Sequence, residues 1–197
     1  MPVMTTQDIR EYLARLRPFI LTSCALLGVG LLLGVMGVSR FPEIAEEFKD
    51  SLGVLIKTFR GLPKLQLAAG IFFNNALKVL FVILLGPLLG VFAVFFLLLN
   101  GAAIAVALYI STHSKGLWLS LLAILPHGIL EIPAVVLGTS VGLMLGVQAM
   151  KRLFGKTPAG IGGELRGAFK FFLFVIAPLL FVAALVESFV TPIIARF

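Results

Sequence analysis

Seven polar side chains interrupt the long apolar runs of this sequence, and they are its best candidates for chemistry. A charged group at bilayer depth costs about 2.5–3.5 kcal/mol, so such residues normally face protein or water. His127 and Glu131 are four residues apart and therefore share one face of a helix. We expect the seven residues to form a polar cluster that lines a pathway for a small solute or an ion: Asn74, Asn75, Lys78, Asn100, His127, Glu131 and Glu187.

Catalysis by the same residues is a weaker interpretation. A His-x-x-x-Glu pair supplies two metal ligands, and only Glu187 is an obvious third, whereas catalytic zinc sites use three protein ligands. The sequence contains no Gly-x-Ser-x-Gly elbow, no phosphate-binding loop and no dinucleotide fingerprint. We therefore predict no enzyme activity, no metal and no cofactor, with an intramembrane hydrolase as an alternative.

The composition is that of an integral membrane protein. Sixty per cent of the 197 residues are hydrophobic and 13% are charged, about half the usual charged fraction of ~25%. The net charge of +7 comes from bases at the ends of apolar runs, where they meet lipid headgroups and orient helices. We predict an all-α, polytopic membrane protein that forms a single membrane domain, with the lipid bilayer and not nucleic acid as its partner.

Hydrophobic periodicity divides the chain into about five spans. Residues 71–112 are too long a run for one span, because a single helix would be about 63 Å long, so we place a break at Gly86-Pro87. Residues 40–70 have helical spacing but are too polar to span, and should form an amphipathic helix that ends near Gly61 and Pro63. The predicted segments are an interfacial helix at 5–17, span 1 at 18–39, the amphipathic segment at 40–70, span 2 at 71–86, span 3 at 88–111, span 4 at 117–149 and span 5 at 170–193.

Span 4 should be kinked or broken, because Pro126 and Pro133 cannot donate hydrogen bonds to the carbonyls of Leu122 and Ile129. Asn100 is a plausible donor to those carbonyls. Small residues at four-residue spacing allow another helix to approach closely. They occur near the His127–Glu131 face and in span 1, and we predict that they pack helices together: Ala134, Gly138, Gly142 and Gly146, and Gly30 and Gly34.

Lysine and arginine gather before span 1 and between spans 4 and 5, and this distribution predicts the orientation. The positive-inside rule then places the N-terminus in the cytoplasm, with the protein in the plasma membrane. Residues 151–170 should be a basic, glycine-rich cytoplasmic loop. By this topology the seven polar residues fall between the midplane and the outer surface. Lys78 is the only base among them, and we predict that it pairs with an acid, by depth Glu187 rather than Glu131.

Four segments resemble the stage II sporulation protein M family of integral membrane proteins. They are FFNNALKV from Phe72, LLLNGAAIA from Leu97, LPHGILEIPAVVLGTSVGL from Leu125 and AALVESFVTP from Ala183, which together cover about residues 70–193. The resemblance implies a multi-pass membrane protein. It also implies a membrane complex, because members in spore-forming bacteria act in engulfment beside peptidoglycan-degrading partners, although relatives also occur in archaea and in bacteria that do not sporulate.

Two functions other than hydrolysis follow from these features. The polar cluster at a broken helix favours a channel or transporter for a small solute or ion. Because five spans are few for such a function, we expect a homodimer. The resemblance favours a scaffold that places other membrane proteins in a complex. In that case the polar cluster only holds helices together, and the amphipathic segment 40–70 is the docking surface.

Overall fold

The computed structural model describes residues 3–59, 61–155 and 160–189, and side chains are described for all of these except 52, 54–59 and 123–127. This part of the chain is almost entirely helical and contains no strand. Five helical stretches are long and apolar enough to cross a membrane: Thr6–Arg40, Lys64–Leu84, Val91–Lys115, Gly128–Leu153 and Ile161–Phe189. The protein is therefore an all-α polytopic membrane protein, as the sequence predicts.

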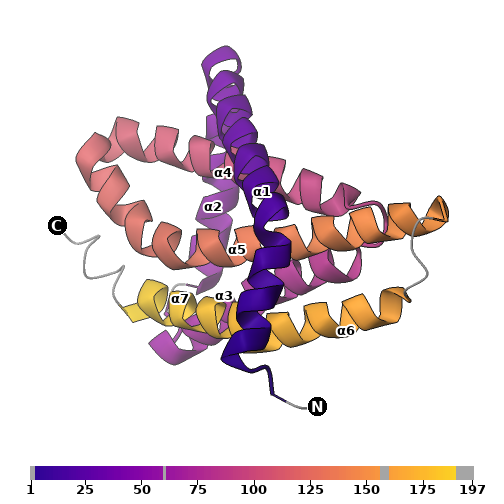
Figure 1. Cartoon of the computed structure of the whole chain (residues 1–197). Coiled ribbons are helices and arrows are strands. Elements are labelled where there is room, and N and C mark those ends of the chain that lie inside the picture. The colour runs from indigo at the N-terminus through magenta and orange to yellow at the C-terminus, as the bar shows by residue number, and fades with distance from the viewer. Residues whose placement is uncertain (1–2, 60, 156–159, 190–197) are drawn as a thin grey trace.

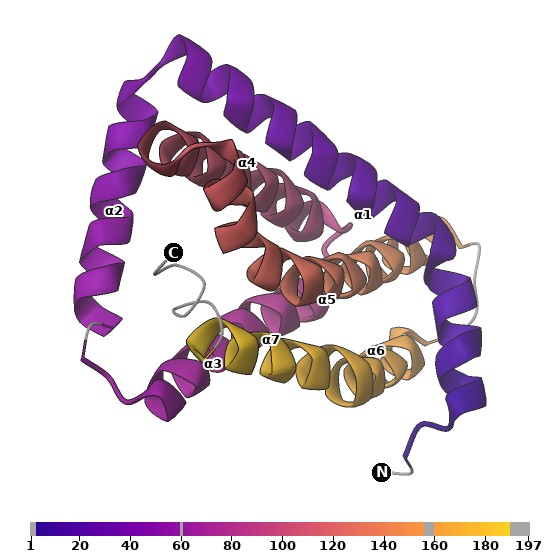
Figure 2. The same cartoon turned by 90° about the vertical axis from the view of Figure 1, so that its left-hand side faces the viewer.

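The helices form three layers with one helix in the middle. Helix α5 (Leu117–Leu153) lies between a layer made of α1 (Thr6–Arg40) and α4 (Val91–Lys115) and a layer made of α3 (Lys64–Leu84), α6 (Ile161–Phe171) and α7 (Ala177–Phe189) (Figure 2). A five-residue π-helical segment, η1 (Phe172–Ile176), joins α6 to α7. Helix α2 (Glu43–Phe59) stands at one side, against α1 and α4.

Helix α1 is one continuous helix of 35 residues that runs through the predicted boundary between the interfacial helix at 5–17 and span 1 at 18–39, and its first turns run in a different direction from the rest (Figure 2). Pro18 lies inside it, where it cannot donate a hydrogen bond to the carbonyl of Ala14 and its ring crowds that carbonyl, so a bend is expected there. Packing holds the helix together across the proline, because Leu13 and Leu16 before it and Phe19 after it all contact the same core. A Thr5–Asp8 capping box starts the helix: each residue's side chain accepts a hydrogen bond from the other's backbone N–H.

Helix α2 is the predicted amphipathic helix, with narrower bounds than 40–70. Its apolar side packs inside the chain, where Ala45 and Phe48 contact Val38 of α1 and Val106 of α4. Its described charged side chains are all exposed: Glu43, Glu46, Glu47, Lys49 and Asp50. The described part of the apolar face, at Ala45 and Phe48, is therefore not the free docking surface that the scaffold interpretation expects.

The predicted break between spans 2 and 3 is confirmed. Residues 85–90 form two tight turns, in which Leu88 N–H donates to Leu85 and Gly90 N–H donates to Gly86, with backbone φ angles of 58° at Leu89 and 70° at Gly90. Glycine suits the second of these angles because it has no Cβ. Span 2 itself begins at Lys64, seven residues before the predicted position 71.

Helix α5 is bent but not broken. It is helical from Leu117 to Leu153, through both Pro126 and Pro133, and its first turns run in a different direction from its long later part (Figure 1). Each proline removes one backbone hydrogen bond and leaves the rest of the ladder in place, so a change of direction is the expected result.

The last span begins much earlier than predicted. Helix α6 starts at Ile161, and α6, η1 and α7 form one stretch to Phe189, so most of the predicted loop 151–170 that is described here is helical. Contacts with α1 explain the early start: Leu165 and Ala168 join the core around Tyr12 and Leu16. Residues 156–159 of the predicted loop and 190–193 of the predicted span lie outside the described residues.

One end of the bundle carries most of the described basic residues, and we name it the basic end. There residues 85–90 turn, α5 ends and α6 begins, while the first turns of α1 lie across α6 (Figure 1). Arg15 pairs with Glu164 at 2.7 Å, and Pro87 lines a pocket with Arg152 and Ile161, so these segments meet. The bases of this end, counting those on α6 and on the first part of α1 that lies across it, are Arg10, Arg15, Arg17, Lys151, Arg152, Arg166 and Lys170.

Candidate functional site

Glu131 and Asn100, two of the predicted residues, meet at a small internal cavity. The cavity has a volume of about 40 Å³ and lies between three helices, with Leu27 from α1, Asn100 and Ile104 from α4, and Glu131, Ile132 and Val135 from α5. The Oε2 atom of Glu131 is buried. A carboxylate and an amide in an otherwise apolar cavity can hold a water molecule or a small cation, because about 10–15 Å³ suffices for one water.

Asn100 does not donate to a carbonyl of α5, as the sequence analysis expects. Its Nδ2 donates to the Phe96 carbonyl of its own helix at 2.7 Å, one turn earlier. The amide oxygen keeps its capacity to accept a hydrogen bond or to contact a cation. The side chain of His127 lies outside the described residues, so its predicted place beside Glu131 stays a prediction.

Asn74 and Lys78 lie on a different surface from Glu131. Both are exposed on α3 and line a groove between α3 and α4, while Asn75, half-buried, accepts a hydrogen bond from Asn74 Nδ2 at 3.2 Å. The structure therefore brings together two of the seven polar residues at Glu131 and two others in the groove, and not the single cluster that the sequence predicts.

The pairing of Lys78 with Glu187 is wrong, because the register of α3 against α7 keeps the two residues apart. The Lys64 amino group lies 5.5 Å from the centre of the Phe189 ring, and the Phe72 and Phe181 rings meet edge to face at 5.7 Å. These antiparallel contacts place Glu187 near the start of α3. Lys78 is about twelve residues further along, or about 18 Å at 1.5 Å per residue.

The predicted depth of Lys78 changes for the same reason. Because α3 begins at Lys64 and ends at Leu84, Lys78 lies in the half of the helix nearer to the turn at residues 85–90, and so nearer to the basic end. Asn74 and Asn75 lie at the middle of the helix. The prediction of one polar band between the midplane and the outer surface therefore fails for Lys78.

The predicted packing residues do pack helices together. A Cβ atom on Gly30 or Gly34 would lie within 2.6 Å of backbone atoms of α4, and one on Gly146 would meet the backbone of Gly90. Gly138, Gly142 and Gly146 of the small-residue ladder of α5 lie mainly against α3 and the turn at residues 85–90, with Ala93 of α4 also near Gly142, whereas Glu131 lines a cavity with α1 and α4. The ladder consists of Ala134, Gly138, Gly142 and Gly146, all buried.

Two features of this core are not among the predicted site residues. Gly101 of α4 lies against the backbones of Leu27 and Leu31, and completes the contact that Gly30 begins. Ser23 of α1 is fully buried and its Oγ lies 3.0 Å from Ser140 Oγ on α5, with Thr139 Oγ1 at 3.5 Å. Neither serine stands out in the sequence, because a hydroxyl inside an apolar helix satisfies itself on a carbonyl one turn earlier.

The described residues do not form a metal site. No three His, Cys, Asp or Glu side chains come together among them, although His127 lies outside that search. The hydrolase interpretation therefore gains no further residues from the structure.

A comparison with protein families gives a match to stage II sporulation protein M over residues 23–192. The chain belongs to this family. The stage II sporulation protein M match begins at Ser23 and so includes the second half of α1 and all of α2, well beyond the segments from residue 70 onward that carry the resemblance in sequence.

A relative of the chain is an uncharacterized protein of Methanocaldococcus jannaschii. It is 27% identical over 183 residues, which is 91% of this chain and 97% of that protein. No solved structure matches the chain. The sequence similarity therefore extends over most of the chain and is not confined to the segments from residue 70 onward.

Proposed function

We propose that this stage II sporulation protein M family member moves a small cation across the membrane, and that Glu131 and Asn100 form its intramembrane binding site. The observation that supports the proposal is their shared cavity between α1, α4 and α5, close to the bend of α5. Ionisable residues inside spans commonly mark ion or proton pathways. Burying a charge in the membrane is costly, so such residues are rare where they have no function.

The size of the cavity narrows the choice of solute. Pockets for organic ligands usually measure about 300–1,000 Å³, far above the 40 Å³ found here. A proton or an inorganic cation fits such a space, whereas an organic solute would require a large rearrangement. The bend of α5 supplies a place for motion, because the hydrogen-bond ladder is weakened at both prolines.

Proteoliposomes test the proposal directly. Wild-type protein should carry protons, sodium or potassium, followed with ion-sensitive dyes, and Glu131→Gln should reduce the flux to that of empty vesicles because it removes the negative charge and keeps the shape. The control is Glu43→Gln, which removes an exposed carboxylate on α2. Both variants should match the wild type in melting temperature and gel-filtration profile.

Wild-type vesicles that are no leakier than empty ones would contradict the transport proposal. They would favour the second candidate function, a scaffold in a membrane complex. The exposed charged face of α2 supports that alternative, since five charged side chains there have no role in the core. If the protein is a scaffold, a membrane protein should co-purify with the wild type and with Glu131→Gln. It should be lost when the charged residues of this face are neutralised.

We also propose that the basic end faces the cytoplasm of the cell that carries the protein in its plasma membrane. Seven described lysines and arginines lie there, and the positive-inside rule places such an end in the cytoplasm. Single cysteines at Leu153 and Trp118, which are 76% and 79% exposed at opposite ends of α5, should react with an impermeant maleimide from opposite sides in a Cys24→Ala background. Labelling of Leu153→Cys in intact cells would indicate the opposite orientation.

A further inference from the structure

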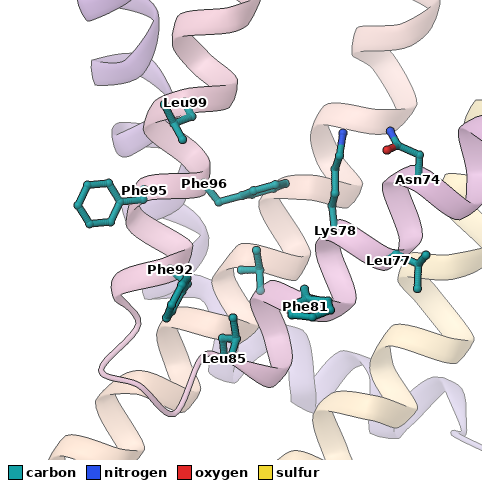
Figure 3. Close-up of a pocket in the computed structure, with 10 residues that line it drawn as sticks. Asn74, Leu77, Lys78, Phe81, Leu85, Phe92, Phe95, Phe96 and Leu99 are labelled. Atoms are coloured by element: carbon teal, nitrogen blue, oxygen red, sulfur yellow. The ribbon is translucent and has the colours of Figure 1, made fainter. Parts of the chain in front are cut away.

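A second site lies on the lipid-facing side of the bundle, between α3 and α4. The two helices meet at the turn of residues 85–90 and diverge from it, leaving a groove with a volume of about 590 Å³ (Figure 3). This volume is in the range of ordinary ligand pockets. The groove is separate from the Glu131 cavity, and shares none of its lining residues with it.

The lining of the groove is apolar except at one end. Aromatic residues of both helices are among those that line it, including Phe81, Phe92 and Phe95, all exposed. The Lys78 amino group and the Asn74 amide lie together at the end away from Leu85 and the turn (Figure 3). From Asn74 to Leu85 the groove follows α3 for about 16 Å.

No contact in the described part of the chain explains why a charged lysine, Lys78, lies at this position of α3. It forms no ion pair with another described residue, and it is exposed where the helix faces hydrocarbon. Its side chain also does not reach toward the nearer, C-terminal end of α3. Helical side chains lean toward the N-terminus of their helix, and the amino group lies level with Asn74 (Figure 3). A lysine inside a span is costly without an anion beside it.

We propose that this groove binds a single-chain amphiphile with an anionic head, drawn from the surrounding lipid. The head pairs with Lys78 and accepts a hydrogen bond from Asn74, whose second amide hydrogen is available beside the bond to Asn75. The chain lies along the phenylalanines toward the turn. In a medium of low dielectric constant, a cation and an anion in contact attract far more strongly than in water, so charge complementarity selects the head.

The depth of the site distinguishes this ligand from ordinary surrounding phospholipid. Resting phospholipids keep their headgroups at the membrane surface, whereas Lys78 is six residues from the nearer end of α3 and fourteen from the other. The groove therefore takes an amphiphile whose head leaves the membrane surface. The free-energy cost of moving the head is lower for a single chain with one small anionic group than for a two-chain lipid with a large head.

Binding of hexadecyl phosphate to the purified full chain in nanodiscs tests the proposal, with hexadecan-1-ol as the uncharged probe. Wild-type protein should bind the phosphate saturably and much more tightly than the alcohol. Lys78→Met should raise the Kd of the phosphate about tenfold or more, because a charge-assisted contact is lost, and leave that of the alcohol unchanged. Lys78→Arg should keep most of the affinity, since the charge remains.

Lys64→Met is the matched control, because Lys64 is on the same helix but outside the groove, and its Kd values should equal those of the wild type. A photoactivatable hexadecyl phosphate should label residues 77–99 in wild-type protein, which gives a readout independent of affinity. Equal affinity of Lys78→Met and wild type, or equal binding of both probes, would overturn the proposal. So would disulfide cross-linking of Phe95→Cys between two copies in native membranes, because a second copy would then cover the groove.

None of these measurements depends on ion flux. A protein that binds hexadecyl phosphate through Lys78 but carries no ions would refute the transport proposal alone. The reverse result would refute only the amphiphile site.

Discussion

Replacing Gly101 by alanine should lower the free energy of unfolding by about 3 kcal/mol, at the upper end of the usual cost of overpacking. The added Cβ would lie 2.4 Å from the Leu27 carbonyl oxygen and 2.8 Å from the Leu31 nitrogen, both backbone atoms of α1. Backbone atoms inside a helix cannot move aside singly as a flexible side chain can. Helices α1 and α4 would have to separate along their contact, and membrane helices associate mainly through such close packing.

Equilibrium unfolding in mixed detergent and sodium dodecyl sulfate, followed by circular dichroism, measures this effect. Gly28→Ala is the matched control, because a Cβ on Gly28 would have nothing within 4 Å, in the same pair of helices. That variant should unfold as the wild type does, or slightly later, since alanine favours helix over glycine. Identical unfolding curves for Gly101→Ala and Gly28→Ala would refute the close contact between α1 and α4.

Phe171→Ala should be the most damaging substitution at the basic end, with a loss of about 3–5 kcal/mol. Phe171 is fully buried and its ring stacks on Tyr12 with centroids 4.7 Å apart, next to Leu16 and Ala168. Its removal would leave a cavity between the start of α1 and α6. The Arg15–Glu164 ion pair beside it cannot compensate, because exposed ion pairs contribute only about 0–1 kcal/mol.

The same unfolding assay applies to Phe171→Ala, with Phe174→Ala as its control. Phe174 lies three residues further along the same helical stretch and is 39% exposed, so its loss should cost much less. Protease sensitivity adds a local readout, because a loosened N-terminal part of α1 should be cut first. Equal stability of the two variants would show that the Tyr12–Phe171 contact does not hold α1 to α6.

The class of the fold and the number of spans follow from sequence because they depend on local composition. Apolar runs of bilayer length predict spans, Gly86-Pro87 predicts the break between α3 and α4, and glycines at four-residue spacing predict close packing. Helix ends are harder to place. Lys64 and Gln66 look too polar for a span, yet they begin α3, because the end of a membrane helix tolerates polar residues.

Errors in helix ends then become errors in contacts. A start seven residues too late changes the depth of Lys78 by about 10 Å and makes a Lys78–Glu187 pair look reasonable. The Ser23–Ser140 contact could not be predicted, since it depends on how α1 and α5 face each other. Asn100 and Glu131 were correctly expected to lie near one another, because both are polar and central in neighbouring spans. The expected homodimer stays a prediction.

The glycine contacts between α1 and α4 also restrict how the protein can move. Their backbones touch at Gly30, Gly34 and Gly101 with no layer of side chains between them, so we expect the two helices to move as one rigid body. The walls of the Glu131 cavity that come from α1 and α4 are therefore fixed relative to each other. Any gate for an ion at Glu131 must be the third wall, and its hinge is the bend of α5.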